Sequence, residues 1–118
     1  MCHFVLPDRR AANNVVRTGS QLNGRYSDAA LALFEREAAK YGTQLNEYQA
    51  KIFGGSNVLT DITPQGAALV GNTNTEAALR HLSEREILLR ASHVGGTGHR
   101  QIVFDVGSGD VWVKHGSL

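Results

Sequence analysis

The sequence has little cysteine, few aromatic residues and no long apolar run. Among 118 residues there is one cysteine, Cys2, and aromatic residues make up 7%. One cysteine excludes an internal disulfide and is compatible with a reducing compartment. No apolar stretch is long enough to span a bilayer, and no basic and apolar leader for secretion is present. We therefore expect a cytoplasmic protein without membrane insertion.

The charge is nearly balanced, with 12 basic against 11 acidic residues and a net charge of +1. This balance gives no general reason to expect nucleic acid or a membrane surface as a partner. Three arginines, Arg9, Arg10 and Arg17, lie in a long polar segment over residues 8–24. We interpret this segment as a solvated loop, although its arginines could attract an acidic partner.

The sequence gives only weak signals for a metal or phosphate site. The five histidines include no pair one helical turn apart, and no Cys-x-x-Cys motif is present, so we predict no metal. His93 and His99 flank a glycine-rich turn and could converge there. Gly54 and Gly55 could offer amides to a phosphate, but no Walker lysine follows, which favours a tight turn. No cofactor is expected.

Residues 27–41 form the clearest predicted helix. Ser27 is the expected N-cap and Gly42 the expected left-handed residue at the C-terminal end. The apolar stripe of this helix includes Phe34 and Tyr41 and is expected to pack on a sheet. We interpret the helix as part of the scaffold.

A second helix is predicted over residues 74–85. Thr73 and Glu76 have the spacing of a capping box, and Leu79 and Leu82 supply part of the buried face. His81 lies off that stripe and is therefore expected to face solvent. Residues 56–72 before this helix are expected to form a loop.

The remaining apolar runs predict strands that end at glycine or proline. The first run, residues 1–7, carries Cys2 and His3, whose side chains would point to opposite faces of a strand. With the helices, the order is β, α, β, α, β, β, β, typical of an α/β sandwich with helices outside mixed sheets. The other predicted strands are residues 45–53, 87–94, 101–106 and 111–114, the last two joined as a hairpin.

Several spaced motifs, in order, resemble the chemoreceptor glutamine deamidases of the CheD family. Residues 70–74, Val-Gly-Asn-Thr-Asn, are similar to that family's Ile-Gly-x-Arg-Asn segment, with Thr73 in place of the usual arginine. Residues 94–96 are similar to its Leu-Gly-Gly turn. The other matching segments are His-Phe-Val-Leu-Pro at 3–7, Arg-Tyr-Ser-Asp-Ala-Ala at 25–30 and Ala-Lys-Ile-Phe-Gly-Gly at 50–55.

The resemblance implies a cytoplasmic enzyme that converts particular glutamines of methyl-accepting chemotaxis receptors to glutamate and releases ammonia. It also implies two packed sheets with outer helices, and a CheC-type phosphatase as a partner. The family's catalytic histidine corresponds to His3, where it activates a cysteine thiolate. Such a pair is chemically reasonable, because a primary amide needs both a strong nucleophile and a proton donor for the departing ammonia.

The resemblance places the family's nucleophile in a Gly-Ser-Cys segment before the histidine strand, together with a site threonine. Cys2 does not match that motif, so the nucleophile's role is not transferred to it. We therefore expect residues 1–118 to form a single CheD-like domain that is incomplete at its N-terminus. Missing strands would leave unpaired edges and exposed apolar side chains and lower the stability.

Two other hypotheses stay open. The chain could be a catalytically inactive short form that binds chemoreceptor or CheC phosphatase as a regulatory module. Alternatively, removal of Met1 would leave Cys2 as an N-terminal nucleophile with its own amine as base.

Overall fold

The computed structural model describes residues 1–8, 22–56 and 64–116, with side chains in its second long helix from residue 72 onward. This part of the chain contains two α-helices, a short 3₁₀ helix and two small sheets, which confirms the predicted α/β class. The elements are α1 (Ser27–Lys40), η2 (Leu45–Glu47), β1 (Gln49–Gly54), α2 (Pro64–Glu84), β2 (Leu88–Val94), β3 (His99–Phe104) and β4 (Val111–Gly116).

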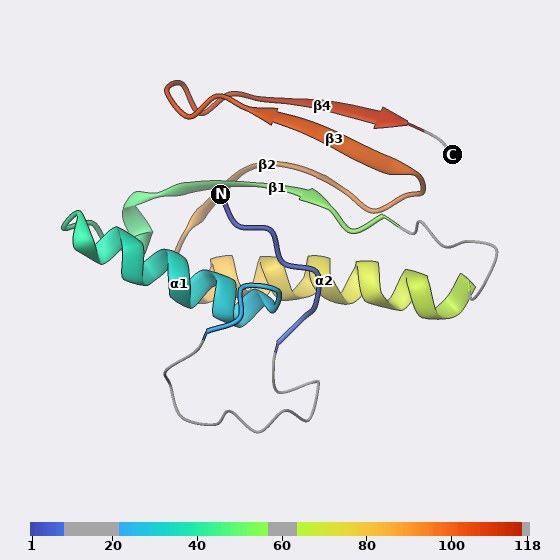
Figure 1. The fold of residues 1–118 in the computed structure, drawn as a ribbon, viewed down its shortest axis with the longest axis horizontal. Helices are drawn as coiled ribbons and strands as arrows, with labels where there is room; N and C mark the ends of the chain where they lie inside the picture. Colours follow the sequence, from blue (N-terminus) through green and yellow to red (C-terminus); the bar gives the residue numbers. More distant parts are fainter. Residues whose placement is uncertain (9–21, 57–63, 117–118) are drawn as a thin grey trace.

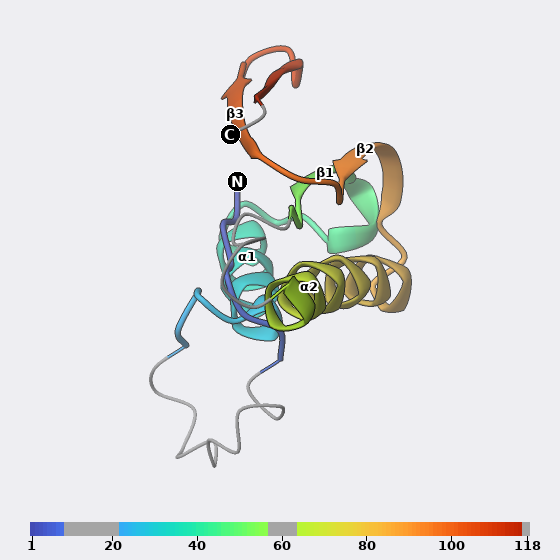
Figure 2. The same cartoon turned by 90° about the vertical axis from the view of Figure 1, so that its right-hand side faces the viewer.

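The elements form three layers. Strands β1 and β2 pair in parallel, in a register that ends with Gly54 opposite Val94, and α2 connects them. Helices α1 and α2 lie side by side on one side of this sheet (Figures 1 and 2). Strands β3 and β4 form an antiparallel hairpin, with Ile102 opposite Val113, and this hairpin lies on the side away from the helices.

Helix α1 has nearly the predicted bounds, but its ends differ in detail. The N-cap is Tyr26, in extended conformation, and Ser27 is the first helical residue, so the prediction of Ser27 as N-cap was wrong. The end is as predicted, because Gly42 has φ +73°, a conformation that glycine adopts without strain. Tyr41, expected on the buried stripe, is the C-cap and is exposed.

Helix α2 begins ten residues earlier than predicted. It starts at Pro64, so residues 64–72, expected as part of a loop, are helical, and Thr73 lies inside the helix instead of capping it. Proline is favoured in the first turn of a helix because its missing N–H has no partner to lose there. In the described part of the chain, no helix has the length and apolarity needed to cross a membrane.

The predicted N-terminal strand is not formed over residues 1–7. Only Leu6 makes a sheet-like contact, an isolated parallel bridge to Tyr26. A strand requires a continuous partner, and Tyr26 is followed immediately by α1, so the pairing cannot extend. The predicted strand over 45–53 is also shorter than expected, because residues Leu45–Glu47 form the 3₁₀ helix η2 before β1 starts.

A compact core joins both helices to the first sheet. Its buried side chains include Ala38 of α1 and Leu82 of α2. Phe34 and Tyr48 meet edge to face at a centroid distance of 5.1 Å at its margin. The other members are Leu45 and Ile87, with Leu31, Ala50 and Ile52 packed against them.

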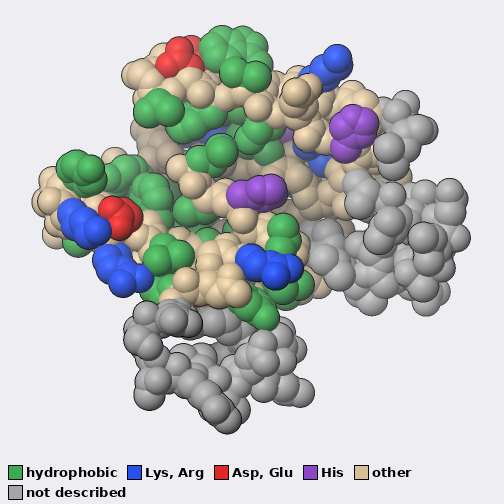
Figure 3. Space-filling view, in the orientation of Figure 1, with side chains coloured by type: hydrophobic (Ala, Val, Ile, Leu, Met, Phe, Trp, Pro, Cys, Tyr) green, Lys and Arg blue, Asp and Glu red, His purple; other side chains and the backbone are tan. Residues whose placement is uncertain are grey.

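The sheets carry exposed apolar side chains. Strand β2 is exposed along its whole length, and Figure 3 shows apolar atoms gathered over the hairpin and the region between it and α1. On the hairpin, Val103 and its cross-strand partner Trp112 are both exposed. Exposed apolar surface and unpaired strand edges favour association.

We predict that Leu82→Ala lowers the free energy of unfolding by about 2–5 kcal/mol, because it removes a buried side chain and leaves a cavity. Leu79→Ala is the matched control on the same helix. Leu79 is 43% exposed whereas Leu82 is 8% exposed, so the control should cost about 1 kcal/mol or less. Urea unfolding followed by circular dichroism measures both, and equal costs would contradict this location of the core.

Candidate functional site

His3 and Cys2, the chemically reactive residues of the N-terminal segment, are both exposed. No hydrogen bond joins His3 to another described side chain. The Cys2 sulfur lies 3.7 Å from the carbonyl oxygen of Ala30 in α1. Partial burial of the sulfur raises the pKa of the Cys2 thiol, against the smaller opposing effect of the nearby N-terminal charge. Because the thiolate is the nucleophilic form, Cys2 is poorly suited to attack an amide.

Backbone contacts attach the segment that follows His3 to both helices. The amides of Val5 and Leu6 both donate to the carbonyl of Arg25 at 2.9 Å, and the amide of Ser27 donates to the carbonyl of Leu6 at 3.0 Å. From α2, the Asn74 side-chain nitrogen donates to the carbonyl of Val5 at 3.0 Å. These bonds fix the backbone within three residues of His3.

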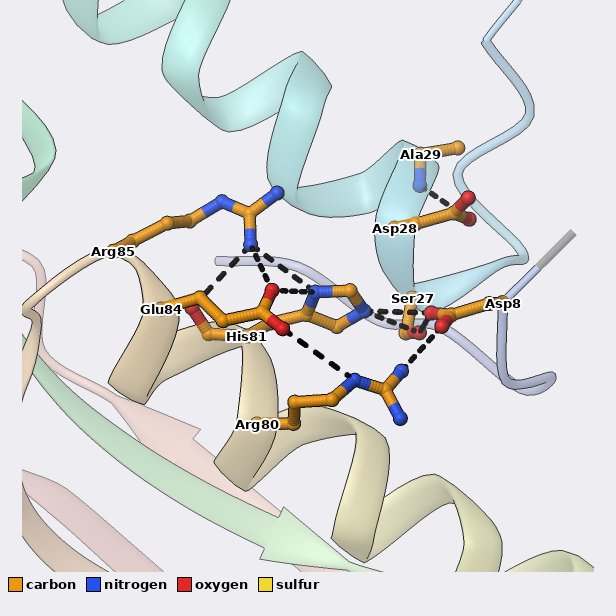
Figure 4. Close-up of polar contacts among 8 residues, drawn as sticks. All are labelled: Asp8, Ser27, Asp28, Ala29, Arg80, His81, Glu84 and Arg85. Atoms are coloured by element: carbon orange, nitrogen blue, oxygen red, sulfur yellow. Dashed lines mark hydrogen bonds and ion pairs between the residues drawn. The ribbon is translucent and has the colours of Figure 1, made fainter. Parts of the chain in front are cut away.

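A polar cluster of Asp8, Ser27, Arg80 and His81 lies where the N-terminal segment meets α1 and α2 (Figure 4). The Ser27 hydroxyl donates to Oδ1 of Asp8 at 3.0 Å, and Nε2 of His81 lies 2.7 Å from the same oxygen. Arg80 forms an ion pair with Oδ2. Ser27 is completely buried and His81 is 5% exposed. The Asp8 carboxylate therefore bonds to both helices at once.

The surroundings of His81 indicate which of its ring nitrogens carries the proton. Nη1 of Arg85 lies 3.1 Å from Nδ1, and a guanidinium can only donate, so Nδ1 is the acceptor. Nε2 then carries the hydrogen and donates to Asp8. Glu84 completes the surroundings, with its carboxylate 3.9 Å from Nδ1 and from Arg85.

The serine, histidine and aspartate of this cluster do not form a catalytic triad. In a triad the acid bonds to one ring nitrogen and the serine to the other. Here the Asp8 oxygen and the Ser27 hydroxyl, 3.2 Å from the ring, both lie at Nε2 of His81. Ser27 has no accessible surface through which a substrate could reach it. The cluster is therefore an anchor between segments.

Sequence reasoning missed this cluster, because His81 was predicted to face solvent and is buried. The prediction used Leu79 and Leu82 to define the buried face of α2, but Leu79 is exposed. The buried positions are Ala77, Ala78, His81 and Leu82, which share one helix face. Two adjacent alanines followed by histidine at the next turn were the available signal.

A second polar cluster joins the two sheets at the glycine pairs. Arg100 of β3 donates to the carbonyls of Gly54 and Gly95, to the Ser56 hydroxyl and to Nδ1 of His93. Gly54 ends β1 and Gly95 follows β2. Both glycines have positive φ, as the predicted tight turns require. Carbonyl oxygens therefore face Arg100 here, which does not match a phosphate cradle.

The histidine that meets His93 is His115 of β4, at a ring centroid distance of 5.4 Å, and not His99. His115 bonds through Nε2 to the carbonyl of Thr97 at 2.6 Å. Within the described ranges, no group of three or more histidine, cysteine, aspartate or glutamate side chains could hold a metal ion.

An open groove lies between the C-terminal ends of α1 and α2. Its lining includes Thr43, Leu45, Glu84 and Arg85. Neither His3 nor Cys2 contributes to it, so the groove is separate from the predicted catalytic residue.

Comparison with known proteins assigns the chain to a family. The model of the CheD family, described as CheD chemotactic sensory transduction, matches residues 5–115, and the chain belongs to this family. A protein of Dechloromonas aromatica named probable chemoreceptor glutamine deamidase CheD 3 is 41% identical over 114 residues, covering 96% of this chain and 63% of that protein.

Other relatives have similar names and coverage. Probable chemoreceptor glutamine deamidase CheD 2 of Albidiferax ferrireducens is 44% identical over 112 residues, covering 95% of this chain and 62% of the relative. Probable chemoreceptor glutamine deamidase CheD of Pseudomonas fluorescens is 40% identical over 116 residues, covering 98% and 62%. The chain therefore spans somewhat less than two thirds of the length of these relatives.

We predict that acid destabilises the protein partly through Asp8. Partial burial alone would raise the pKa of Asp8, but hydrogen bonds from His81 and Ser27, with the charge of Arg80, outweigh it and lower the pKa. A lowered folded-state pKa stabilises the fold above the unfolded value, about 3.9, and this stabilisation is lost as the pH falls through the folded value.

Asp8→Asn should therefore lower stability at neutral pH and reduce its loss below about pH 4, measured as urea midpoints across the acid range. Glu37→Gln is the control. Its carboxylate pairs with Lys40 on the exposed surface of α1, where solvent weakens the ion pair. If the two variants have the same acid dependence, Asp8 is not the dominant acid-sensitive contact.

Proposed function

We propose that this chain is the histidine-bearing part of a protein-glutamine deamidase that acts on methyl-accepting chemotaxis receptors in the cytoplasm. The family match over residues 5–115, with relatives named as chemoreceptor glutamine deamidases, is the observation that carries the proposal. His3 is the proposed catalytic residue. A CheC-type phosphatase is the proposed regulatory partner, as the family resemblance implies.

In the proposed reaction, His3 takes the proton of a cysteine thiol, and the thiolate attacks the carbonyl carbon of the glutamine amide. A carbon–sulfur bond forms, the carbon–nitrogen bond breaks, and the histidine proton leaves with ammonia. Water then hydrolyses the thioester, which gives glutamate and regenerates the thiol. The exposure of His3 is compatible with access by a receptor side chain.

Cys2 is not the proposed nucleophile. Its sulfur faces the Ala30 carbonyl and its thiol pKa is raised, whereas an attacking cysteine needs a lowered pKa. Cys2 is also the single cysteine of these 118 residues. The nucleophile in this proposal is therefore supplied from outside the 118-residue sequence.

The unsuitability of Cys2 as a nucleophile also favours a second candidate function. A chain whose sole cysteine is unsuited to attack could bind chemoreceptor or CheC-type phosphatase as a regulatory module without chemistry of its own. Deamidase and module differ in one measurable respect, which is whether receptor glutamine becomes glutamate.

We predict that protein purified from its own cells, in the length made there, converts glutamine to glutamate in a chemoreceptor cytoplasmic fragment. Peptide mass spectrometry and ammonia release measure the reaction. His3→Ala should slow it by about 10²-fold or more, because the thiolate loses its base and ammonia its proton donor. His99→Ala, another exposed histidine, and Cys2→Ala should leave the rate within about threefold.

Each contrary outcome has a distinct meaning. Retained receptor binding without conversion would establish the regulatory module. Conversion that survives His3→Ala would remove His3 from the mechanism. Loss of conversion on Cys2→Ala, with the fold intact, would make Cys2 the nucleophile.

A further inference from the structure

The N-terminal segment that carries His3 has no secondary structure of its own beyond one bridge at Leu6. Its position therefore depends on contacts with other elements. Before His3, the Cys2 sulfur contacts the Ala30 carbonyl. After His3, the contacts are the backbone bonds to Arg25 and Ser27, the Asn74 bond to Val5 and the Asp8 cluster.

We propose that Asp8 and Asn74 are positioning residues for His3, Asp8 by bonding to Ser27, His81 and Arg80, and Asn74 by bonding to the Val5 carbonyl. Neither residue is proposed to touch the substrate. Their side chains instead fix the backbone on the C-terminal side of His3 against α1 and α2. This inference rests on the proposed function for its catalytic consequence, but the anchoring is testable without it.

The Asp8 anchor requires a carboxylate. Oδ1 accepts from both Ser27 and His81, and Oδ2 accepts from Arg80, so each of its oxygens faces donors alone. An asparagine has one oxygen and one NH₂ group, so its NH₂ would face at least one donor, from Arg80 or from Ser27 and His81. Asp8→Asn thus keeps the size of the side chain but removes the match between its acceptor oxygens and the surrounding donors. His81 cannot compensate, because Arg85 occupies its other ring nitrogen.

Asn74 supplies an independent attachment from α2. Its nitrogen donates to the Val5 carbonyl, two residues beyond His3. Its side-chain oxygen is buried and has no hydrogen-bond partner in the described residues. A buried polar oxygen without a partner is costly, so this oxygen contributes nothing to the stability of the helix. Asn74→Ala removes one bond to the segment and also this cost.

The first test measures amide hydrogen exchange. The amides of Val5 and Leu6, both bonded to Arg25, report on the segment, and the amide of Gly95, bonded to Gly54 at 2.9 Å, reports on the parallel sheet. Because Asp8→Asn also lowers the global stability, we expect it to speed exchange at Val5 and Leu6 about tenfold more than at Gly95. Asn74→Ala should give the same pattern with a smaller increase, and Glu37→Gln should leave all three rates unchanged.

Equal acceleration at all three amides would mean that Asp8 acts only through the stability of the whole fold, which overturns the positioning role. Unchanged rates at Val5 and Leu6 would also overturn it. Asn74→Ala keeps the proposal testable if Asp8→Asn does not fold, because it removes a single hydrogen bond to the segment.

The second test uses the receptor assay on the natively expressed protein. A displaced His3 should lower kcat about tenfold or more in Asp8→Asn while KM changes by about twofold or less, because geometry at the reacting atoms is lost and receptor binding is not. A raised KM with unchanged kcat would contradict positioning. If the parent protein shows no conversion, the proposed function fails, whereas the exchange measurement still decides whether the segment is anchored as inferred.

Discussion

The Asp8 carboxylate bonds to side chains that lie 19, 72 and 73 residues further along the chain, from the start of α1 and the last turns of α2. Both of its oxygens accept hydrogen bonds, and both ring nitrogens of His81 are occupied, so the cluster is internally satisfied. This completeness matters because a buried polar group without a partner is costly in a low-dielectric interior. A cluster so matched specifies one arrangement of the N-terminal segment against the two helices.

The burial of Ser27 and His81 depends in turn on small side chains. Ala29 and Ala30 of α1 and Ala77 and Ala78 of α2 are all buried, and alanines allow two helices to approach closely. At the end of the alanine face of α2, His81 takes the next buried position. Apolar packing and the polar anchor are therefore parts of one helix contact.

The periodicity of the sequence predicted the α/β class, the span of α1, most of the strand runs with the C-terminal hairpin, and the glycine turns, because these depend on local patterns and backbone conformation. Prediction from periodicity failed where tertiary contacts determine the structure. The run at residues 1–7 has strand character but no continuous partner, and α2 extends back to Pro64 through residues that include a glycine. His81 was misplaced because large leucines were given more weight than small alanines in defining the buried face. The family resemblance identified His3 as the candidate site residue, and neither its role nor the anchoring cluster follows from periodicity.

The two polar clusters hold different parts of the molecule. Arg100 joins the hairpin to the ends of β1 and β2, whereas Asp8 and Asn74 join the N-terminal segment to the helices, and they share no residue. Contacts without shared partners contribute nearly independently to stability. The segment with His3 can therefore loosen while the sheets stay intact. Such local opening is expected of a functional segment that has little secondary structure. A histidine in such a segment keeps a defined geometry only if contacts with other elements impose it, and Asp8 and Asn74 supply such contacts.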